Sequence, residues 1–333
     1  MQDTRSERLS ADTIAQMKAQ RVQPEIAGYG AKRVGGNAIN FIAHSWVDGA
    51  ETTTLPMIDA LGRGDSHAVV EAVLNDGVRV PMIVDTGAAS DVLSPSLVEK
   101  LKLPLFDIGD ATPTVRGVGG EQTCFPGGLS KMRLGQIELH NTVVVVLTEQ
   151  HRQYGLGLIR GQTVDNGIIG MNTLGRFRWV SFDWRRRKLT LGRVGDYQTD
   201  ALKLADSIPF DIIYSKLVIN AEVSKANKRT SLSLMLDTGS DDEMMLPMKA
   251  AQDLRLLDMA APPGDRRWIT GLGGSYIGSP FVTAALKIGR LQFMRVSGHT
   301  VPDNIGGVLG NKLMREFKTT FDFAHRRLIF ERY

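Results

Sequence analysis

The stretch Val84-Asp85-Thr86-Gly87-Ala88 ends an apolar run over residues 80–84, and Leu236-Asp237-Thr238-Gly239-Ser240 ends a second run over 232–236. Such β-rich apolar runs predict buried strands. A glycine after the aspartate permits a tight turn and a close approach of backbone. A strand of this kind holds a carboxylate rigidly at its end. Two copies in one chain predict that Asp85 and Asp237 form a pair.

From residue 55 onward the sequence contains an internal repeat around these two turns. Six further landmarks recur in the same order: 55–57 with 208–210, 68–74 with 216–223, 116–121 with 270–275, 132–137 with 286–291, 167–170 with 307–310, and 180–184 with 320–323. The offset is 152 between the aspartates (237−85), 154 between Gly117 and Gly271 (271−117), and 140 between Gly167 and Gly307 (307−167). We interpret this pattern as a duplication.

Within each repeat the segments are short, β-branched and interrupted by glycine, which predicts an all-β barrel or sandwich rather than a parallel α/β sheet. Helical pattern is confined to brief pieces after each aspartate, at residues 94–101 and 247–254. The predicted organisation is a flexible N-terminal extension over 1–54 with a short helix over 11–20, a first lobe over 55–195, a linker over 196–207, and a second lobe over 208–333. We expect the glycine-rich stretch 28–36 to be a surface loop, since it lacks the Gly-Lys-Ser/Thr ending of a phosphate loop.

Composition limits the classes of function. A chain of 333 residues suits two domains, and 42% hydrophobic with 23% charged residues indicates a soluble, globular protein. The net charge of +4 is too small to indicate nucleic-acid binding. One cysteine, Cys124, excludes an internal disulfide framework, and six histidines without ligand spacing predict no metal site.

The sequence is compatible with more than one cellular compartment. Residues 1–8 lack the apolar core of a signal peptide, and no run of eighteen apolar residues predicts a membrane span. We expect a cytoplasmic protein if the sequence is complete, and a periplasmic or secreted one if a signal peptide has been removed. Residues 1–54 are a candidate for a removable prosegment.

The order Asp-Thr-Gly-Ala/Ser, then a glycine-rich hairpin, then Ile-Ile-Gly or Val-Leu-Gly, resembles the aspartic peptidases of the retropepsin-like branch. The resemblance covers residues 55–333, and residues 237–242 are similar to the retroviral form of the motif. It implies a bilobal fold of closed β-barrels with the active site at the lobe interface. It also implies a monomer that carries both halves in one chain, uses no cofactor or metal, and binds a peptide or protein substrate.

The resemblance also implies a role for each matching residue. Two carboxylates about 3 Å apart share one proton, so Asp85 and Asp237 would be the catalytic dyad. Thr86 and Thr238 would hydrogen-bond across the lobe interface, and the turn residues Gly87, Gly239 and Ser240 would support the dyad. The substrate would contact two flaps and the cleft, at Gly117, Val118, Gly119, Gly120, Gly271, Leu272, Gly273, Gly274, Asp241 and Asp242.

The chain departs from the family pattern in ways that carry expectations. Ala88 has no hydroxyl where Ser240 has one, so we expect Asp237 to be the more easily ionised partner. Met171 and Asn311 stand where retroviral enzymes have an arginine, so the arginine–carboxylate pair should be absent. The cleft should be asymmetric, since Ala89 and Ser90 stand opposite Asp241 and Asp242.

Two rival interpretations remain open. One is a catalytically idle protein that binds peptides in the same cleft. The other takes the basic runs 185–188 and 325–327 as a surface for an anionic partner such as nucleic acid or lipid, whereas we expect these runs to be solvated hairpin turns. Because both aspartates and both Thr-Gly pairs are intact, the sequence favours an endopeptidase.

Overall fold

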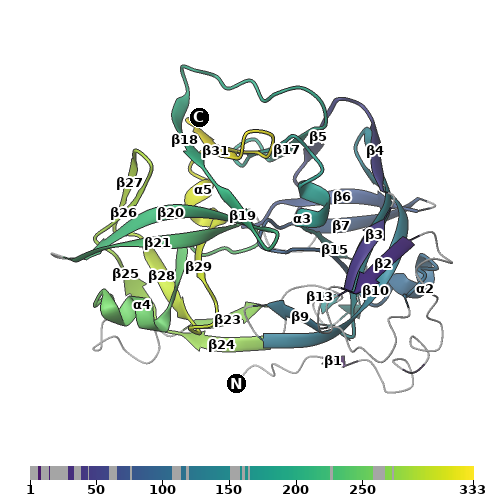
Figure 1. Ribbon diagram of the computed structural model, residues 1–333, viewed down its shortest axis with the longest axis horizontal. Helices are drawn as coiled ribbons and strands as arrows, with labels where there is room; N and C mark the ends of the chain where they lie inside the picture. Colours follow the sequence, from purple (N-terminus) through teal and green to yellow (C-terminus); the bar gives the residue numbers. More distant parts are fainter. Residues whose placement is uncertain are drawn as a thin grey trace.

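The computed structural model describes residues 45–59, 66–75, 77–106, 114–117, 120–150, 166–225, 228–257, 267–271 and 274–333, with shorter pieces at 7–8, 15, 29–33, 39–43, 158–159 and 162–163. The fold is all-β, as predicted. The first half of the chain (blue and teal) and the second half (green to yellow) lie side by side (Figure 1).

The first half forms an eight-stranded sheet with the order β4-β11-β8-β15-β7-β6-β10-β9. These strands are β4 (Trp46–Gly49), β6 (Val69–Leu74), β7 (Val78–Val84), β8 (Asp91–Leu93), β9 (Thr114–Gly117), β10 (Gly120–Leu134), β11 (Ile137–Leu147) and β15 (Gly167–Ile169). Because β10 also pairs with β11, the six strands from β11 to β10 in this order close into a barrel. Within β7, Val80 and the last three residues, Met82, Ile83 and Val84, are buried, so the end of the strand that leads to Asp85 lies in the core.

The second half forms a sheet whose main path is β25-β28-β22-β29-β21-β20-β26-β27, with β19 paired to β20. These strands are β19 (Asp211–Ile213), β20 (Lys216–Lys225), β21 (Lys228–Asp237), β22 (Met244–Pro247), β25 (Pro280–Val282), β26 (Ala285–Ile288), β27 (Leu291–Met294), β28 (Ser297–Val301) and β29 (Gly307–Gly310). The order β28-β22-β29-β21-β20-β26 repeats β11-β8-β15-β7-β6-β10, including the parallel pairs β15–β7 and β29–β21. Strands β7 and β21, which lead to Asp85 and Asp237, therefore occupy matching places in the two sheets.

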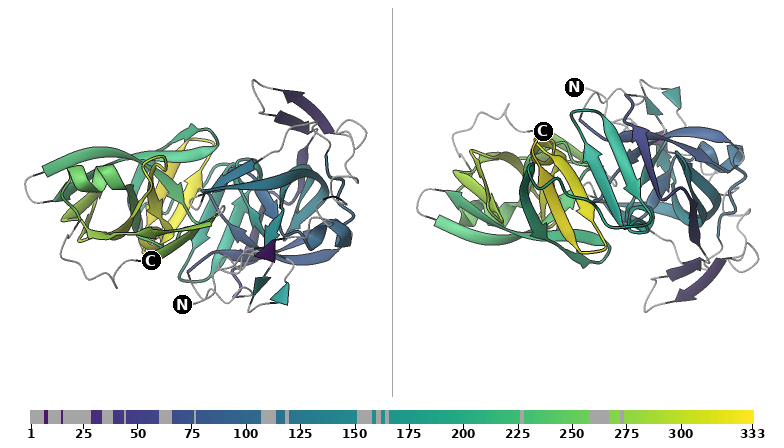
Figure 2. Two further views of the ribbon diagram at one scale, coloured as in Figure 1. Left: turned by 90° about the horizontal axis from the view of Figure 1, so that it is seen from below. Right: turned by 90° about the horizontal axis from the view of Figure 1, so that it is seen from above.

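A six-stranded sheet joins the two halves, in the order β18-β31-β30-β16-β17-β5. Its strands are β5 (Thr52–Pro56), β16 (Trp179–Asp183), β17 (Lys188–Gly192), β18 (Leu204–Pro209), β30 (Lys318–Asp322) and β31 (Arg327–Glu331). At its centre β16 pairs with β30, where Thr320 Oγ1 donates to Ser181 Oγ at 2.8 Å. The view from above in Figure 2 shows this sheet between the two halves.

The remaining elements are short. They are the strand pairs β1 (Glu7–Arg8) with β12 (Glu149–Gln150), β2 (Tyr29–Arg33) with β3 (Ile39–Ala43), β13 (Leu158–Ile159) with β14 (Gln162–Thr163) and β23 (Arg267–Gly271) with β24 (Gly274–Gly278), and the helices α2 (Leu97–Lys100), α3 (Met171–Leu174), α4 (Met248–Asp253) and α5 (Asn311–Met314). Both α2 and α4 fall within the helical pieces predicted after the aspartates. No helix in the described ranges is long and apolar enough to cross a bilayer.

The N-terminal extension differs from the prediction. Strand β4 pairs with β11 and β5 pairs with β17, so residues 46–54 belong to the sheets rather than to a separate segment. In β5 the side chains of Thr53 and Leu55 are buried while their neighbours are exposed, which is the alternation of a half-buried strand. The stretch 28–36 contains β2 rather than only a loop, and the predicted linker 196–207 overlaps β18. The helix predicted over 11–20 lies outside the described residues apart from Ala15.

The joining sheet should be needed for the stability of both halves. Phe182 is fully buried, and its ring meets that of Phe321 edge to face with centroids 5.6 Å apart. Phe182→Ala should lower the free energy of unfolding by about 3–5 kcal/mol, because it leaves a cavity between the halves. Denaturant unfolding measures this. Leu202, 97% exposed, gives the control Leu202→Ala, which should stay within about 0.5 kcal/mol. Equal losses in the two variants would contradict the prediction.

Candidate active site

The two Asp-Thr-Gly turns meet at the junction of the halves. Asp85 directly follows β7, and Asp237 is the last residue of β21. The residues before them, Val84 and Leu236, are fully buried. Ile169 in β15 pairs with Val84, and Leu309 in β29 pairs with Leu236, so each aspartate has a paired strand behind it. The predicted backing strands therefore lie where the repeat places them.

Thr86 and Thr238 bind the two turns to each other. The Thr86 hydroxyl donates to the Leu236 carbonyl at 2.9 Å and accepts from the Thr238 N–H at 3.1 Å. The Thr238 hydroxyl donates to the Val84 carbonyl at 2.8 Å and accepts from the Thr86 N–H at 3.0 Å. Both threonines are buried, at 1% and 0% exposure. Four hydrogen bonds without competing water hold the turns in one relative position.

The glycine of each turn lies against the aspartate of the other. A Cβ built on Gly87 would stand 2.5 Å from Asp237 Cγ, and one built on Gly239 would stand 2.5 Å from Asp85 Cγ. No side chain larger than hydrogen fits at that distance. The two glycines therefore let the carboxyl groups approach, and Asp85 and Asp237 hydrogen-bond to each other through their side chains.

Burial raises the pKa of both carboxyl groups. For Asp85 the rise is opposed by backbone hydrogen bonds, from the N–H groups of Gly87 at 2.7 Å and Ala88 at 3.2 Å and from Gly239. For Asp237 the charge of Asp85 adds to the effect of burial, so its pKa lies well above the ordinary value. Asp85 Oδ1 accepts from two backbone N–H groups and Asp237 Oδ1 from one, which favours ionisation at Asp85.

These backbone donors favour the order opposite to the one predicted from Ser240. The prediction assumed a hydrogen bond from the Ser240 hydroxyl to Asp237, whereas the carboxyl receives its bonds from the backbone of Gly239 and Ser240. At the matching position Ala88 donates from its backbone N–H, which needs no hydroxyl. Asp85 therefore loses no hydrogen-bond donor because Ala88 lacks a hydroxyl group.

A second set of contacts reaches the turn of Asp237 from the first half. His67 is 3% exposed, and its Nε2 lies 2.9 Å from the Gly239 carbonyl oxygen, while Nδ1 lies 2.7 Å from Ser66 Oγ. Asn311 Nδ2 donates to the carbonyls of Ser66 at 2.7 Å and Thr238 at 2.9 Å. Sequence reasoning missed this network, since His67 shows no ligand spacing and its partner is 172 residues away.

Two further carboxylates, Asp91 and Glu243, follow the Asp-Thr-Gly turns in the chain and have cations near them. Buried Asp91 accepts from the Gly170 N–H and the Thr173 hydroxyl, and burial raises its pKa to about 7 while Arg176 opposes the rise. Glu243 pairs with Lys312 at 2.8 Å and accepts from Ser297. Met171 and Asn311 stand where an arginine was expected to be missing, and the nearby cations Arg176 and Lys312 lie five and one residues further along the chain.

The predicted flaps form the tips of two hairpins. Gly117 pairs with Gly120 in β9–β10, and Gly271 pairs with Gly274 in β23–β24. Gly120 and Gly274 have φ of +128° and +134°, values that L side chains rarely adopt. Figure 1 shows both hairpins on the same side of the molecule, and β10 contacts β24. Val118, Gly119, Leu272 and Gly273 lie outside the described residues.

The cleft residues Asp241 and Asp242 differ in exposure. Asp241 is exposed, whereas Asp242 is 9% exposed and its Oδ1 lies 3.2 Å from His299 Nδ1. The predicted counterparts Ala89 and Ser90 carry no charge. The two sides of the junction therefore present different surfaces, acidic with an imidazole on one side and uncharged on the other.

One group among the described residues has ligand atoms close enough to hold a metal ion: Asp48, Glu138 and His140, whose ligand atoms lie within 4.8 Å of one another. It lies on β4 and β11, away from the Asp-Thr-Gly turns. His140 Nε2 faces Asp48 Oδ2 at 3.2 Å, and Lys131 lies 3.7 Å from Glu138.

Comparison with known families agrees with this geometry. An aspartyl protease family model matches residues 70–173. The matched region contains the turn of Asp85, the β9–β10 hairpin and β15, and it ends in α3. No curated protein matches the chain. The match therefore supports an aspartic protease at the level of the family, and the turn of Asp237 lies beyond the matched residues.

Thr86→Val tests the hydrogen bonds between the turns. The change leaves the buried Leu236 carbonyl and Thr238 N–H without a partner, so the free energy of unfolding should fall by about 2–4 kcal/mol. Thr86→Ser keeps the hydroxyl and should retain most of the stability. Denaturant unfolding measures the free energy of unfolding of both variants. Equal values for the valine and serine variants would show that these hydrogen bonds contribute little to stability.

The order of ionisation can be measured by carbonyl-carbon NMR titration. Both aspartates should titrate above the ordinary value of 3.8, and Asp237 above Asp85. In Asp85→Asn the pKa of Asp237 should fall, because the neighbouring charge is removed. In the unaltered protein, the folded state keeps protons on these carboxyl groups at pH values where the unfolded chain has already released them. The free energy of unfolding should therefore fall as pH rises from 3.8 to the raised pKa values of the folded state. An Asp237 pKa below that of Asp85 would refute the assignment.

Proposed function

We propose that the protein is an aspartic endopeptidase that hydrolyses peptide bonds with a water held between Asp85 and Asp237. The observation that carries the proposal is the approach of two strand-end carboxyl groups that hydrogen-bond to each other at the junction of the halves. Like charges so close share one proton near neutral pH. The family match of residues 70–173 supports the same chemistry.

The roles of the two aspartates follow from their ionisation. Ionised Asp85 takes a proton from the water as its oxygen attacks the scissile carbonyl carbon, and protonated Asp237 donates its proton to the carbonyl oxygen. The tetrahedral diol then collapses: Asp85 returns its proton to the leaving amine, and Asp237 regains a proton from the hydroxyl group that becomes the new carboxyl group. At the end of the cycle Asp85 is again ionised and Asp237 is again protonated.

The substrate in this proposal is an extended peptide or an unfolded protein. The tips at Gly117–Gly120 and Gly271–Gly274 would close over it and exclude water, and strand pairing with the hairpins would hold its backbone. We further propose that the two halves are repeats of one retropepsin-like unit, working as a single chain. The common strand order of the two sheets supports this.

Cleavage of an unfolded protein substrate from about pH 3 to about pH 8 tests the proposal. Asp85→Asn and Asp237→Asn should each lower the rate by about 10³-fold or more, because each removes one member of the proton pair. Asp211→Asn changes an exposed carboxylate on β19 and should leave the rate unchanged.

Cleavage that survives either dyad substitution would end the dyad proposal. If the unaltered protein binds the unfolded substrate but cleaves it at no pH, the idle peptide-binding protein is the correct alternative. Binding should be measured on the same samples by fluorescence anisotropy with a labelled peptide, so that the two outcomes are separated.

A further inference from the structure

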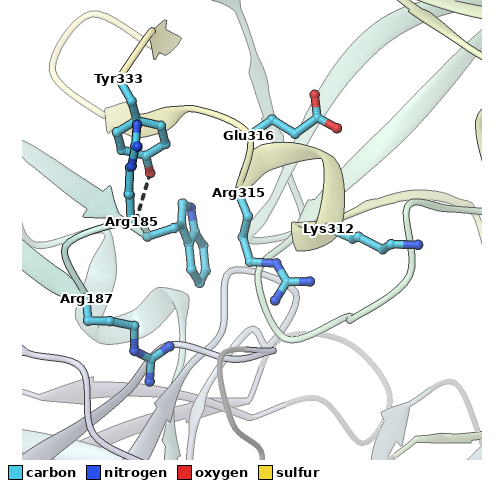
Figure 3. A pocket seen from close by; sticks show the side chains of 7 residues that line it. Arg185, Arg187, Lys312, Arg315, Glu316 and Tyr333 are labelled. Carbon is cyan, nitrogen blue, oxygen red and sulfur yellow. Dashed lines mark hydrogen bonds between the residues drawn. The ribbon is translucent and has the colours of Figure 1, made fainter.

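A basic pocket of about 520 Å³ lies at the junction of the halves, between the turn that follows β16 and helix α5 (Figure 3). Its lining residues are Trp184, Arg185, Arg187, Lys312, Arg315, Glu316 and Tyr333. Four of the seven are cations and one is a carboxylate, a formal charge of +3 (4−1). In Figure 3 the Glu316 carboxylate points away from the guanidinium groups of Arg187 and Arg315.

The walls of the pocket are held in place by contacts of their own. The Tyr333 hydroxyl accepts from the Arg185 N–H at 3.1 Å and donates to the Phe317 carbonyl at 3.0 Å. The Arg185 guanidinium lies over the Tyr333 ring, 5.8 Å from its centroid. Lys312 pairs with Glu243 at 2.8 Å, so a carboxylate outside the pocket already balances its charge. The arginines therefore supply most of the positive charge that a ligand would meet.

Trp184 forms part of the pocket wall. Its side chain is 6% exposed, and its ring stacks on that of Phe182 with centroids 5.2 Å apart. The wall is therefore fixed by packing in the joining sheet.

The matching surface in the other half carries a different set of charges. With the offset of 139 between Asp183 and Asp322 (322−183), Arg185 corresponds to Ala324 and Arg187 to Arg326. With the offset of 140 between Gly170 and Gly310 (310−170), Lys312 and Arg315 correspond to Asn172 and Gly175, and Glu316 corresponds to Arg176. The two surfaces therefore differ in where their cations stand.

Residues of the basic run 185–188 lie both inside and outside the pocket. As predicted, it forms a turn between β16 and β17. Arg186 pairs with Asp183 at 3.4 Å and lies outside the pocket, whereas Arg185 and Arg187 line it. The residues 325–327 form the matching turn, where His325 and Arg327 bind Asp322.

We propose that this pocket binds a phosphate group, either free phosphate or the phosphate of a small monoester, and that the bound group joins the two halves. Guanidinium groups bind phosphate oxygens through pairs of parallel hydrogen bonds, and a dianion gains from several cations at once. The volume suits a small ligand. Arg185 and Arg187 come from the first half and Lys312 and Arg315 from the second, so a bound phosphate stabilises their junction.

Isothermal titration of the full chain with inorganic phosphate and with phenyl phosphate, at ionic strength fixed with sodium chloride, tests the proposal. We expect saturable binding of one phosphate per chain, together with a rise in the unfolding temperature. Arg185→Gln and Arg315→Gln should each weaken binding about tenfold. Tighter binding of phenyl phosphate would assign a monoester, and tighter binding of the free ion would assign inorganic phosphate.

Arg186→Gln is the matched control, because it removes the same charge from the same turn outside the pocket. It should leave the affinity unchanged. Glu316→Gln removes the repelling carboxylate from an exposed position and should strengthen binding several-fold, which keeps the test decisive if an arginine variant folds poorly. No saturable binding at about 10 mM of either probe, or an equal loss in Arg186→Gln, would overturn the proposal.

Discussion

The arrangement of the candidate site depends on the exchange of hydrogen bonds between Thr86 and Thr238. Each hydroxyl donates to a carbonyl of the opposite turn and accepts from the opposite N–H, so neither turn is complete without the other. This exchange places Gly87 against Asp237 and Gly239 against Asp85. The closeness of the carboxyl groups is thus a consequence of backbone positions held below them, and it needs no flexible side chain to maintain it.

Near-symmetry of the backbone coexists with different electrostatics in the two halves. The strands around each aspartate follow the same order, yet only the turn of Asp237 receives His67 from the opposite half. Asp85 has more backbone donors and Asp237 has the neighbouring charge, which separates their tendencies to ionise. A proton pair needs such a difference if one carboxyl group is to act as base while the other acts as acid.

Local pattern accounts for what could be predicted. The apolar runs before each aspartate, the glycine turns and the short helices are encoded by neighbouring residues, and they appear where the repeat indicated. Strands β4 and β5 were missed because each is short and its partner, β11 or β17, lies about 90 or more residues further along the chain. The cations at Arg176 and Lys312 were missed because a helical turn, rather than a motif position, brings each beside its carboxylate.

The sequence by itself determined the all-β class and the two strand-end aspartates, because strand periodicity and glycine turns are local properties. Only the tertiary structure decided that the two carboxyl groups meet and which backbone N–H groups they accept from, since these groups come from turns 152 residues apart. It also decided that Arg185 and Arg187 share a pocket with Lys312 and Arg315. Charges far apart in the chain act together only after folding sets the distance between them.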